Sequence, residues 1–532
     1  MIVVVELVNG VSIRGWAVNF QNFAERLTVQ TWINGRFYLE TTANLFRADL
    51  LGNNVGDGAF GFEQPITSDM YFNDRGEAFS LEVRGFLEDG TPVETNFLSD
   101  ALSAVKSRVA IPELAVTTPN IFGDGFFCDN IRAHNRVLDL SDDFYAAERC
   151  KKSIISVRMY GFGDFMWWDD PETATGPSAA KFLSHIGPQT KERLANGSAK
   201  LMFDMSNEGP TAMPCSYWLQ LLHQELYERG INPSSCVMVN HNAMYDKDYA
   251  AWCQSAGQTD AMDVLHYDFY LAKFAHLTSD MPQEGLRLEP SIEETESYRA
   301  FVCLNFTPRQ DRLSFLAWLF GAELSEHGFI SFAGFANHKM DGSDFSVPEW
   351  FPEPAAVRDG IDQLKTLGRL TLDLPEENGR RTPEFDLGPQ HCFHTSFFSI
   401  VTESDFSDGE VRRITEKCLK PLAMGHPIIV VGNPYSLQRL RELGFRTFAP
   451  FIDESYDTCE DRFERMTLVQ AEVRRLATMP KAELVQLRVN LRRVIEHNYR
   501  HARGGLADLY RSVIEPGFLD ALDGLSWESA AP

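Results

Sequence analysis

The sequence predicts a multidomain protein in which an N-terminal all-β sandwich is followed by two Rossmann-like α/β lobes. Three observations lead to this prediction. At 532 residues the chain is too long for one ordinary core, so two to four domains are expected. The first 105 residues hold short runs of β-branched and aromatic residues separated by Asn-Gly and Asp-Gly turns, which is typical of hairpins. From Ser153 onward, apolar runs alternate with helical patterns, as in parallel sheets.

The composition excludes several functional classes. Hydrophobic residues make up 44% of the chain and aromatic residues 12%, which permits large cores and argues against global disorder. The formal charge of −26 argues against a broad nucleic-acid-binding surface, which needs clustered Lys and Arg. The nine cysteines include no CxxC pair, so neither a zinc site nor a disulfide framework is expected. Reduced thiols in a cytoplasm are the simplest account.

The sequence shows no pattern of a membrane-inserted protein. The first residues, MIVVVELVNG, lack a basic region and reach Glu6 after five residues, so we expect no signal peptide. No apolar run approaches the ~20 residues that span a bilayer. We therefore expect a cytoplasmic protein that contacts a membrane at most peripherally.

The chain is expected to consist of five segments. In the first of them, Asn34-Gly35 and Asp89-Gly90 mark hairpin turns. The next segment has no clear period and is interpreted as a connector. The segments are the β-sandwich at 1–105, the connector at 106–150, the first α/β lobe at 151–297, the second at 298–460 and C-terminal helices at 461–532.

The first α/β lobe offers three candidates for a general base. Strands are expected at 153–160, 200–206 and 235–242, each followed by a helix. Ligands of parallel sheets bind beyond the carboxyl ends of the strands. For each candidate alone, a cap or a satisfied polar loop residue is the alternative interpretation. The three candidates at these predicted strand ends are Asp164, Glu208 and His241, with Gly161, Gly163, Asn207 and Asn242 beside them.

The second lobe contains the most informative stretch of the chain. A strand at 398–401 is followed by an acidic loop at 403–410, a helix at 414–424 that ends at Gly425, and a strand at 427–431. A helix N-terminus favours anions through its dipole and its free N–H groups. Thr415 and Glu416 are also ordinary first-turn residues, which is the alternative interpretation. The residues near this helix start are Thr415, Glu416, Lys417 and Lys420.

A second cationic group is expected in the same lobe. Asn305, Arg309 and Arg312 follow the strand predicted at 298–306, at the loop and first turn of the next helix. Guanidinium groups in that place can hold a pyrophosphate bidentately, and the alternative is pairing with surface carboxylates. An irregular insertion is expected at 340–390. Two amphipathic helices with Arg-rich polar faces are expected after residue 461.

The segment TEKCLKPLAMGHPIIVVG, residues 415–432, resembles the donor-binding domain of glycosyltransferases of the fucosyltransferase and exostosin type. The resemblance covers residues 298–460 and is closest to bacterial and phage glycosyltransferase-like proteins. The segments GWAVN and FRADLLGNNVGDGAFGFE resemble an accessory module attached to bacterial glycosyltransferases. The resemblance implies a GT-B-like pair of lobes, with the acceptor largely on the N-terminal lobe and C-terminal helices that commonly cross back to it.

The resemblance also implies a function. The chain would transfer a sugar from a nucleotide-sugar donor to a glycan acceptor, in surface polysaccharide or lipopolysaccharide synthesis, at the inner face of a membrane. Lys417 or Lys420 would neutralise the β-phosphate, and Glu416 would accept hydrogen bonds from ribose hydroxyls. Glu403 is a further donor-binding candidate. It lies seven residues before Glu410, one short of the spacing in the paired-glutamate motif of many retaining enzymes, so that motif is not carried over.

No cofactor and no metal are expected, because the acidic clusters WWDDPE and LSDDF lack a convincing Asp-x-Asp arrangement. The chain has no GxSxG, HExxH or P-loop motif. Two alternatives stay open. One is a non-catalytic carbohydrate-binding or structural protein on a degenerate transferase scaffold. The other is a nucleotide-sugar-modifying enzyme, which would need a complete dinucleotide fingerprint. The oligomeric state, the sugar and the stereochemistry stay open as well.

Overall fold

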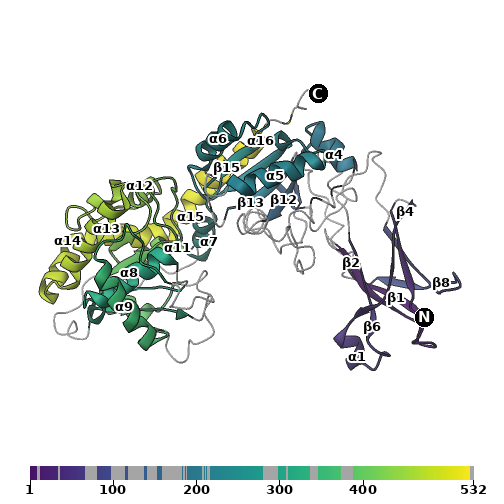
Figure 1. Cartoon of the computed structure of the whole chain (residues 1–532), viewed down its shortest axis with the longest axis horizontal. Coiled ribbons are helices and arrows are strands. Elements are labelled where there is room, and N and C mark those ends of the chain that lie inside the picture. The colour runs from purple at the N-terminus through teal and green to yellow at the C-terminus, as the bar shows by residue number, and fades with distance from the viewer. Residues whose placement is uncertain are drawn as a thin grey trace. The chain divides into compact units, whose positions relative to one another are not determined.

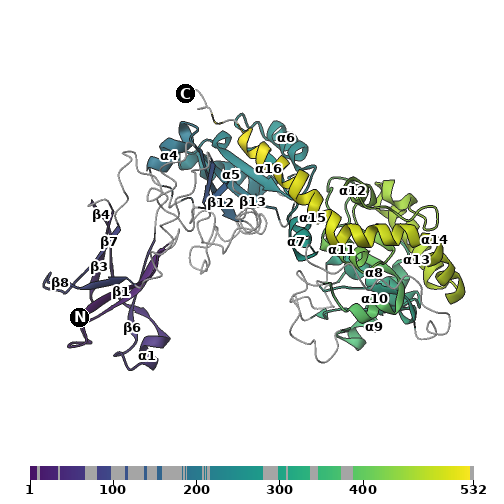
Figure 2. The same cartoon turned by 180° about the vertical axis from the view of Figure 1, so that it is seen from behind.

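The computed structural model divides the chain into two compact units (Figures 1 and 2). The first comprises residues 1–240, 249–267 and 521–532, and the second comprises 241–248 and 268–520. The structure describes residues 1–8, 12–33, 36–65, 81–97, 114–117, 137–139, 152–158, 183, 186, 188–206, 209, 211–212, 216–278, 298–306, 309–335, 345–372, 387–525 and 527.

The N-terminal part of the first unit consists of two sheets that share a core. One has the order β5-β6-β2-β1-β9 and the other β4-β3-β7-β8. Val3 and Phe62 from the first sheet and Val29 and Val83 from the second are buried in one cluster. The elements are β1 (Ile2–Val8), β2 (Ser12–Val18), β3 (Thr28–Ile33), β4 (Arg36–Thr42), β5 (Leu45–Phe46), α1 (Ala48–Gly52), β6 (Ala59–Pro65), β7 (Leu81–Phe86), β8 (Pro92–Val93) and β9 (Thr95–Phe97).

The hairpin predicted at Asp89-Gly90 is confirmed. It joins β7 to β8, which pair antiparallel. Gly90 has a φ of +82°, which glycine adopts without strain, and the Asp89 carboxylate accepts a hydrogen bond from the N–H of Thr91 at 2.9 Å. The turn predicted at Asn34-Gly35 lies outside the described residues.

The first α/β sheet is parallel throughout, with the order β11-β10-β12-β13-β14-β15. Two of its strands come from 106–150, where the sequence predicts only a connector. They are four and three residues long, too short to show a period. The elements are β10 (Leu114–Thr117), β11 (Val137–Asp139), β12 (Lys152–Arg158), α4 (Pro188–Ala195), β13 (Ala199–Met205), α5 (Ser216–Glu228), β14 (Cys236–Asn240), α6 (Tyr245–Ala256) and β15 (Asp263–His266).

The second sheet, β17-β16-β18-β19, is also parallel. Every residue of its two C-terminal strands is buried, as expected for apolar runs covered on both faces. The elements of this unit are α7 (Phe269–Thr278), β16 (Arg299–Cys303), α8 (Gln310–Gly321), β17 (Gly328–Ile330), α9 (Pro354–Leu367), α10 (Gln390–His394), β18 (Ser396–Thr402), α11 (Glu416–Ala423), β19 (Ile428–Val431), α12 (Ser436–Glu442), α13 (Arg462–Ala477), α14 (Lys481–Arg500), α15 (Leu506–Leu509) and α16 (Glu515–Asp523).

The helix start and stop predicted around residue 415 agree with the structure. Thr415 is the N-cap of α11, and its hydroxyl accepts a hydrogen bond from the N–H of Lys417. At the other end the N–H of His426 reaches the carbonyl of Pro421 at 2.9 Å, and Gly425 has a φ of +73°. This is a Schellman motif, which glycine permits because it tolerates a positive φ.

One expectation about the helices is wrong, and another holds only in part. The segment 340–390 is not wholly irregular, because α9 lies within it and buries Val357, Ile361 and Leu364 at helical spacing. The arginines of α13 and α14 are not all on a polar face. Arg465 and Arg488 are buried and donate to backbone carbonyls, Arg488 to those of Phe397 and Gly425 at 3.1 and 3.2 Å. Among the described helices, none is long and apolar enough to cross a bilayer.

Helices α8 and α9 lie side by side at a very close approach (Figure 1). A Cβ atom built at Gly321 would lie 1.8 Å from the carbonyl oxygen of Ala356, and one at Gly360 would lie 1.8 Å from that of Ala317. The two helices therefore pack backbone to backbone at these glycines. Neither glycine can gain a side chain unless the helices separate.

We expect Gly360→Ala to destabilise the protein by about 2–4 kcal/mol, because the new methyl group forces α8 and α9 apart. Gly517→Ala in α16 is the control. It has no heavy atom within 4 Å of its built Cβ, so alanine should stabilise there by about 0.5–1 kcal/mol. Urea unfolding of both variants measures the difference. A neutral or stabilising Gly360→Ala would show that the close approach is not maintained.

Candidate functional site

The candidate site is built on the loop between β18 and α11, residues 403–415. At its start, the buried carboxylate of Glu403 accepts hydrogen bonds from the Thr415 N–H at 3.0 Å, the Thr415 hydroxyl at 2.7 Å and the Ser404 N–H at 3.3 Å. These bonds join the two ends of the loop. They also orient Thr415 as the helix cap, so Glu403 acts as a buried residue that positions the groups of the site.

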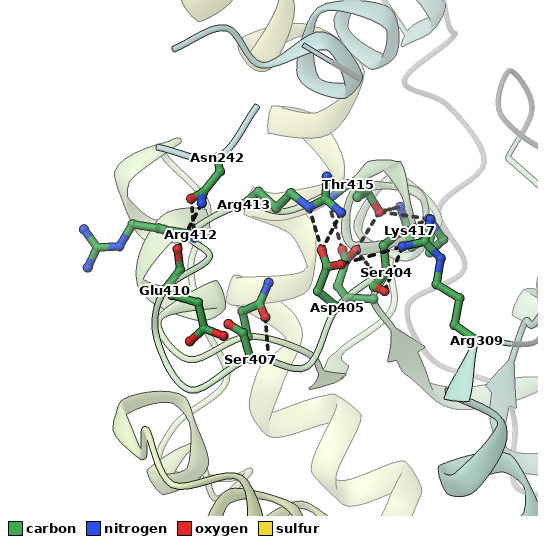
Figure 3. A network of polar contacts seen from close by, with 12 residues as sticks. Asn242, Arg309, Ser404, Asp405, Ser407, Glu410, Arg412, Arg413, Thr415 and Lys417 are labelled. Atoms are coloured by element: carbon green, nitrogen blue, oxygen red, sulfur yellow. Dashed lines mark hydrogen bonds and ion pairs between the residues drawn. The ribbon is translucent and has the colours of Figure 1, made fainter. Parts of the chain in front are cut away.

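Lys417 occupies the first turn of α11 and points back toward the loop (Figure 3). Its ammonium lies 3.2 Å from the Thr415 hydroxyl, 3.5 Å from the Ser404 hydroxyl and 3.3 Å from Oε1 of Glu416. The side chain is 29% exposed. A cation at a helix N-terminus opposes the helix dipole, so helix stability alone does not account for it. The carboxylate of Glu416 is the anion that pairs with it in this structure.

Glu416 is the most unusual group of the site. It is 7% exposed, and its Oε2 has no hydrogen-bond partner among the described residues. Burial opposes its ionisation, but the ammonium groups of Lys417 and Lys420 outweigh burial and hold the pKa of Glu416 below its ordinary value. It is therefore an ionised carboxylate with one unused oxygen. Such an oxygen costs about 1–3 kcal/mol or more when no donor reaches it.

Two arginines of the α8 segment reach the same loop. Arg309, the N-cap residue of α8, donates to the carbonyl of Ser404 at 3.2 Å and is 42% exposed. Arg312 is buried and donates to the carbonyl of Glu403 at 3.1 Å. Figure 3 shows Arg309 and Lys417 approaching Ser404 from two different elements. Two partly exposed cations therefore converge on Ser404, Arg309 on its carbonyl and Lys417 on its hydroxyl.

Asp405 lies between Arg309 and a third cation, Arg413. Oδ2 of Asp405 accepts a hydrogen bond from Nε of Arg413 at 2.6 Å and lies 2.5 Å from Nη2 of the same arginine (Figure 3). Arg309 lies 3.6 Å from Oδ1 of Asp405. Arg413 is buried, so this pair is an internal brace of the loop. Asp405 therefore faces the buried arginine more closely than the half-exposed one.

The structure brings together all eight predicted donor-binding residues. Lys420 is buried in the second turn of α11 and Asn305 is buried below the loop, where its side-chain oxygen accepts from the Thr402 hydroxyl at 2.7 Å. The predicted residues that gather at the loop are Asn305, Arg309, Arg312, Glu403, Thr415, Glu416, Lys417 and Lys420.

The candidates for a general base are placed differently. Asp164 and Glu208 lie outside the described residues. His241 is fully buried, with Nε2 3.2 Å from Asp268 and its ring 5.5 Å from that of Tyr270. In the described part of the chain, no three His, Cys, Asp or Glu side chains are grouped as metal ligands.

Sequence reasoning missed several residues that shape the loop. Ser404 and Asp405 directly follow Glu403, and the cluster of Asp and Arg around them was the only local signal. The contact of Asp405 with Arg413 spans eight residues of irregular chain, where no periodicity predicts a pairing. Asn242 was placed on the rim of the first lobe, yet its side chain bonds to residues 410 and 412.

Comparisons with known proteins add the following. No protein-family model and no curated protein matches the chain. Among solved structures, trehalose-6-phosphate from E. coli bound with UDP-2-fluoro glucose aligns at 13% identity and a TM-score of 0.32, over 68% of this chain and 73% of that one. A UDP-forming α,α-trehalose-phosphate synthase from Burkholderia xenovorans aligns at 11% and 0.33, over 78% and 99%. Such TM-scores do not establish a shared fold.

Asp311, in the first turn of α8, provides a test of the electrostatics beside the site. Burial raises the pKa of Asp311 to about 6, against the opposing charge of Arg462, and Asp405 adds to the rise. The folded pKa lies above that of the unfolded chain, near 3.9. The folded state therefore holds the proton more tightly between about pH 4 and 6, and this carboxyl lowers stability as the pH rises through that window.

We expect Asp311→Asn to be more stable than the wild type by about 1–2 kcal/mol at pH 8, after allowance for the lost charge at the helix start. The gain should nearly vanish at pH 4, where the native carboxyl is protonated. Urea unfolding of both proteins at the two pH values measures it. An equal difference at pH 4 and pH 8 would contradict a raised pKa.

Proposed function

We propose that the chain is a glycosyltransferase that moves a sugar from a nucleotide-sugar donor to a glycan acceptor. The donor phosphates would bind at the loop 403–415, beside the N-terminus of α11. One observation carries this proposal. Arg309 and Lys417, from two separate elements, converge half-exposed on Ser404 next to Glu416, a buried carboxylate with an unused oxygen. An anion and a hydroxyl donor on one ligand would satisfy both features.

Each group has a role in this proposal. Arg309 presents a planar fork that suits two phosphate oxygens, and Lys417 acts as a point charge. The first N–H groups of α11 add a positive potential. Oε2 of Glu416 is buried in this structure and would accept hydrogen bonds from ribose hydroxyls once ligand binding uncovers it. The cations supply the neutralisation of the leaving phosphate, and for that reason a metal-independent transfer is part of the proposal.

The reaction follows from these roles. The acceptor hydroxyl attacks the anomeric carbon of the sugar, and the bond from that carbon to the phosphate oxygen breaks. The nucleoside diphosphate leaves with the electron pair, stabilised by Arg309 and Lys417. The hydroxyl proton passes to a general base, for which Asp164, Glu208 and His241 stay the predicted candidates. A cytoplasmic setting in surface polysaccharide or lipopolysaccharide synthesis completes the proposal and rests on sequence resemblance alone.

Nucleotide binding is the first test. Thermal shift against nucleoside diphosphates and their sugars should raise Tm, since a ligand at 100 times its Kd stabilises by about 2.7 kcal/mol. We expect Lys417→Ala and Arg309→Ala to weaken the bound nucleotide by about 10- to 100-fold, because each removes a charge-assisted hydrogen bond.

The matched controls are Lys365→Ala and Arg492→Ala, which remove exposed cations of ordinary helix ion pairs and should leave the Kd unchanged. If no nucleotide raises Tm, or if Lys417→Ala binds like the wild type, the donor site is wrong. Donor hydrolysis or transfer by the wild type, lost in both site variants, separates an enzyme from a non-catalytic binding protein.

Glu416 gives a sharper test of the ligand's shape. Glu416→Gln should weaken a nucleoside diphosphate by about tenfold, because a neutral amide is a poorer acceptor for ribose hydroxyls. Inorganic pyrophosphate should bind equally well or more tightly, since a negative charge beside Lys417 is removed. Calorimetric titration of both ligands measures the two changes. Equal losses for both ligands would place Glu416 elsewhere than at the ribose.

A further inference from the structure

We propose that Asn242 is a positioning residue of the donor site: its side chain holds the backbone of the loop that aims Arg309. This inference rests on the proposed function and assigns a further residue to that site. Asn242 follows β14 in sequence but belongs to the compact unit that contains the loop. Figure 3 shows it beside Glu410 and Arg412, at the far end of the loop from Lys417.

Asn242 grips the loop through both ends of its amide. Its Nδ2 donates to the carbonyl of Glu410 at 2.9 Å, and its Oδ1 accepts from the N–H of Arg412 at 2.9 Å. The N–H of Ala243 adds a bond to the carbonyl of Arg412 at 3.0 Å. Asn242 is 1% exposed, so its loss would leave the buried backbone groups without hydrogen bonds to water in their place. The backbone around residue 411 is therefore fixed by a residue far away in sequence.

A short chain of contacts leads from this grip to the cation. Arg413 directly follows the held residue, and its guanidinium binds Asp405 at 2.5 and 2.6 Å. Asp405 lies 3.6 Å from Arg309, which also donates to the carbonyl of Ser404. A shift of residue 412 would move Arg413, and Arg413 would move the carboxylate of Asp405, which is the anionic group beside Arg309. Because residues 403–415 form no helix or strand, side-chain contacts contribute much of what sets these positions.

The neighbouring residue reaches the other cation. The ring of His241 lies 5.5 Å from that of Tyr270, and the ammonium of Lys417 lies 6.0 Å from the same tyrosine ring. Asn242 is thus connected to Arg309 through the loop, and His241 is connected to Lys417 through Tyr270. The middle of the loop is held separately, by Asn433, which accepts from the N–H of Ser407 at 2.8 Å, and by Arg465.

Asn498 offers a matched control within the same unit. It is also 1% exposed and grips one residue in the same manner, accepting from the N–H of Arg446 at 2.8 Å and donating to its carbonyl at 2.7 Å. That residue lies after α12 and has no contact with the loop 403–415 among the described interactions. Loss of Asn498 should therefore cost stability through two of the same kind of bond without affecting the donor site.

The experiment compares Asn242→Ala with Asn498→Ala in the full chain. Urea unfolding should show a loss of stability for both variants and a larger one for Asn242→Ala. That variant removes three hydrogen bonds, including one from the N–H of Met244 at 3.0 Å, and Asn498→Ala removes two. Calorimetric titration with UDP, GDP and inorganic pyrophosphate should show about tenfold weaker binding for Asn242→Ala and less than twofold change for Asn498→Ala. In an Arg309→Ala background, Asn242→Ala should cost at most about twofold more, because it acts through that arginine.

The outcomes separate the two proposals. If the wild type binds a nucleotide and Asn242→Ala binds it equally well, Asn242 is only a structural anchor and this inference falls alone. The same holds if both asparagine variants weaken binding alike, or if the losses of Asn242→Ala and Arg309→Ala multiply. If the wild type binds neither nucleotides nor pyrophosphate, the proposed function falls and takes this inference with it. Asn242→Ser, which keeps a short polar group, serves as the milder variant if the alanine variant does not fold.

Discussion

The candidate site depends on the bonds between the Glu403 carboxylate and Thr415. A carboxylate removed from water is costly unless donors surround it, and here two groups of Thr415 and the N–H of Ser404 do so. These bonds join the two ends of an irregular loop, one at the end of β18 and the other at the start of α11. The groups that point into the site are positioned by this closed loop. They are the cap of α11, Lys417 in the first turn of α11, and Ser404, whose carbonyl accepts a hydrogen bond from Arg309.

The buried and the exposed cations of this unit make different kinds of contact. Buried arginines donate to backbone carbonyls, Arg488 to Phe397 and Gly425, and Arg465 to Ser407 and the residues before α13. They clamp irregular chain and are shielded from ligands. Arg309 and Lys417 are half-exposed instead. Each of these two cations has a carboxylate beside it, Asp405 at 3.6 Å from Arg309 and Glu416 at 3.3 Å from Lys417. The buried side chains of Arg312, Arg413 and Lys420 add positive charge around the loop, which favours an anion there even in a chain with a net charge of −26.

Local patterns carried much of the prediction from sequence. The buried strands β18 and β19, the cap at Thr415 and the glycine after α11 all follow from residue spacing, and Arg309 and Lys417 follow from their place at helix starts. Contacts between distant residues did not. The role of Glu403 inside the loop, the pair of Asp405 with Arg413 and the grip of Asn242 on Arg412 depend on tertiary placement, which periodicity does not encode.

The unused oxygen of Glu416 bears on the kind of ligand that the site favours. Phosphate alone would satisfy Arg309 and Lys417 but would meet the charge of Glu416 with repulsion, and Oε2 would still lack a donor. A ligand with a phosphate at one end and hydroxyl groups at the other satisfies the cations and the carboxylate together. Under the proposed function, the carboxylate would therefore discriminate against free inorganic anions and in favour of phosphorylated compounds that carry vicinal hydroxyls, as nucleotides do.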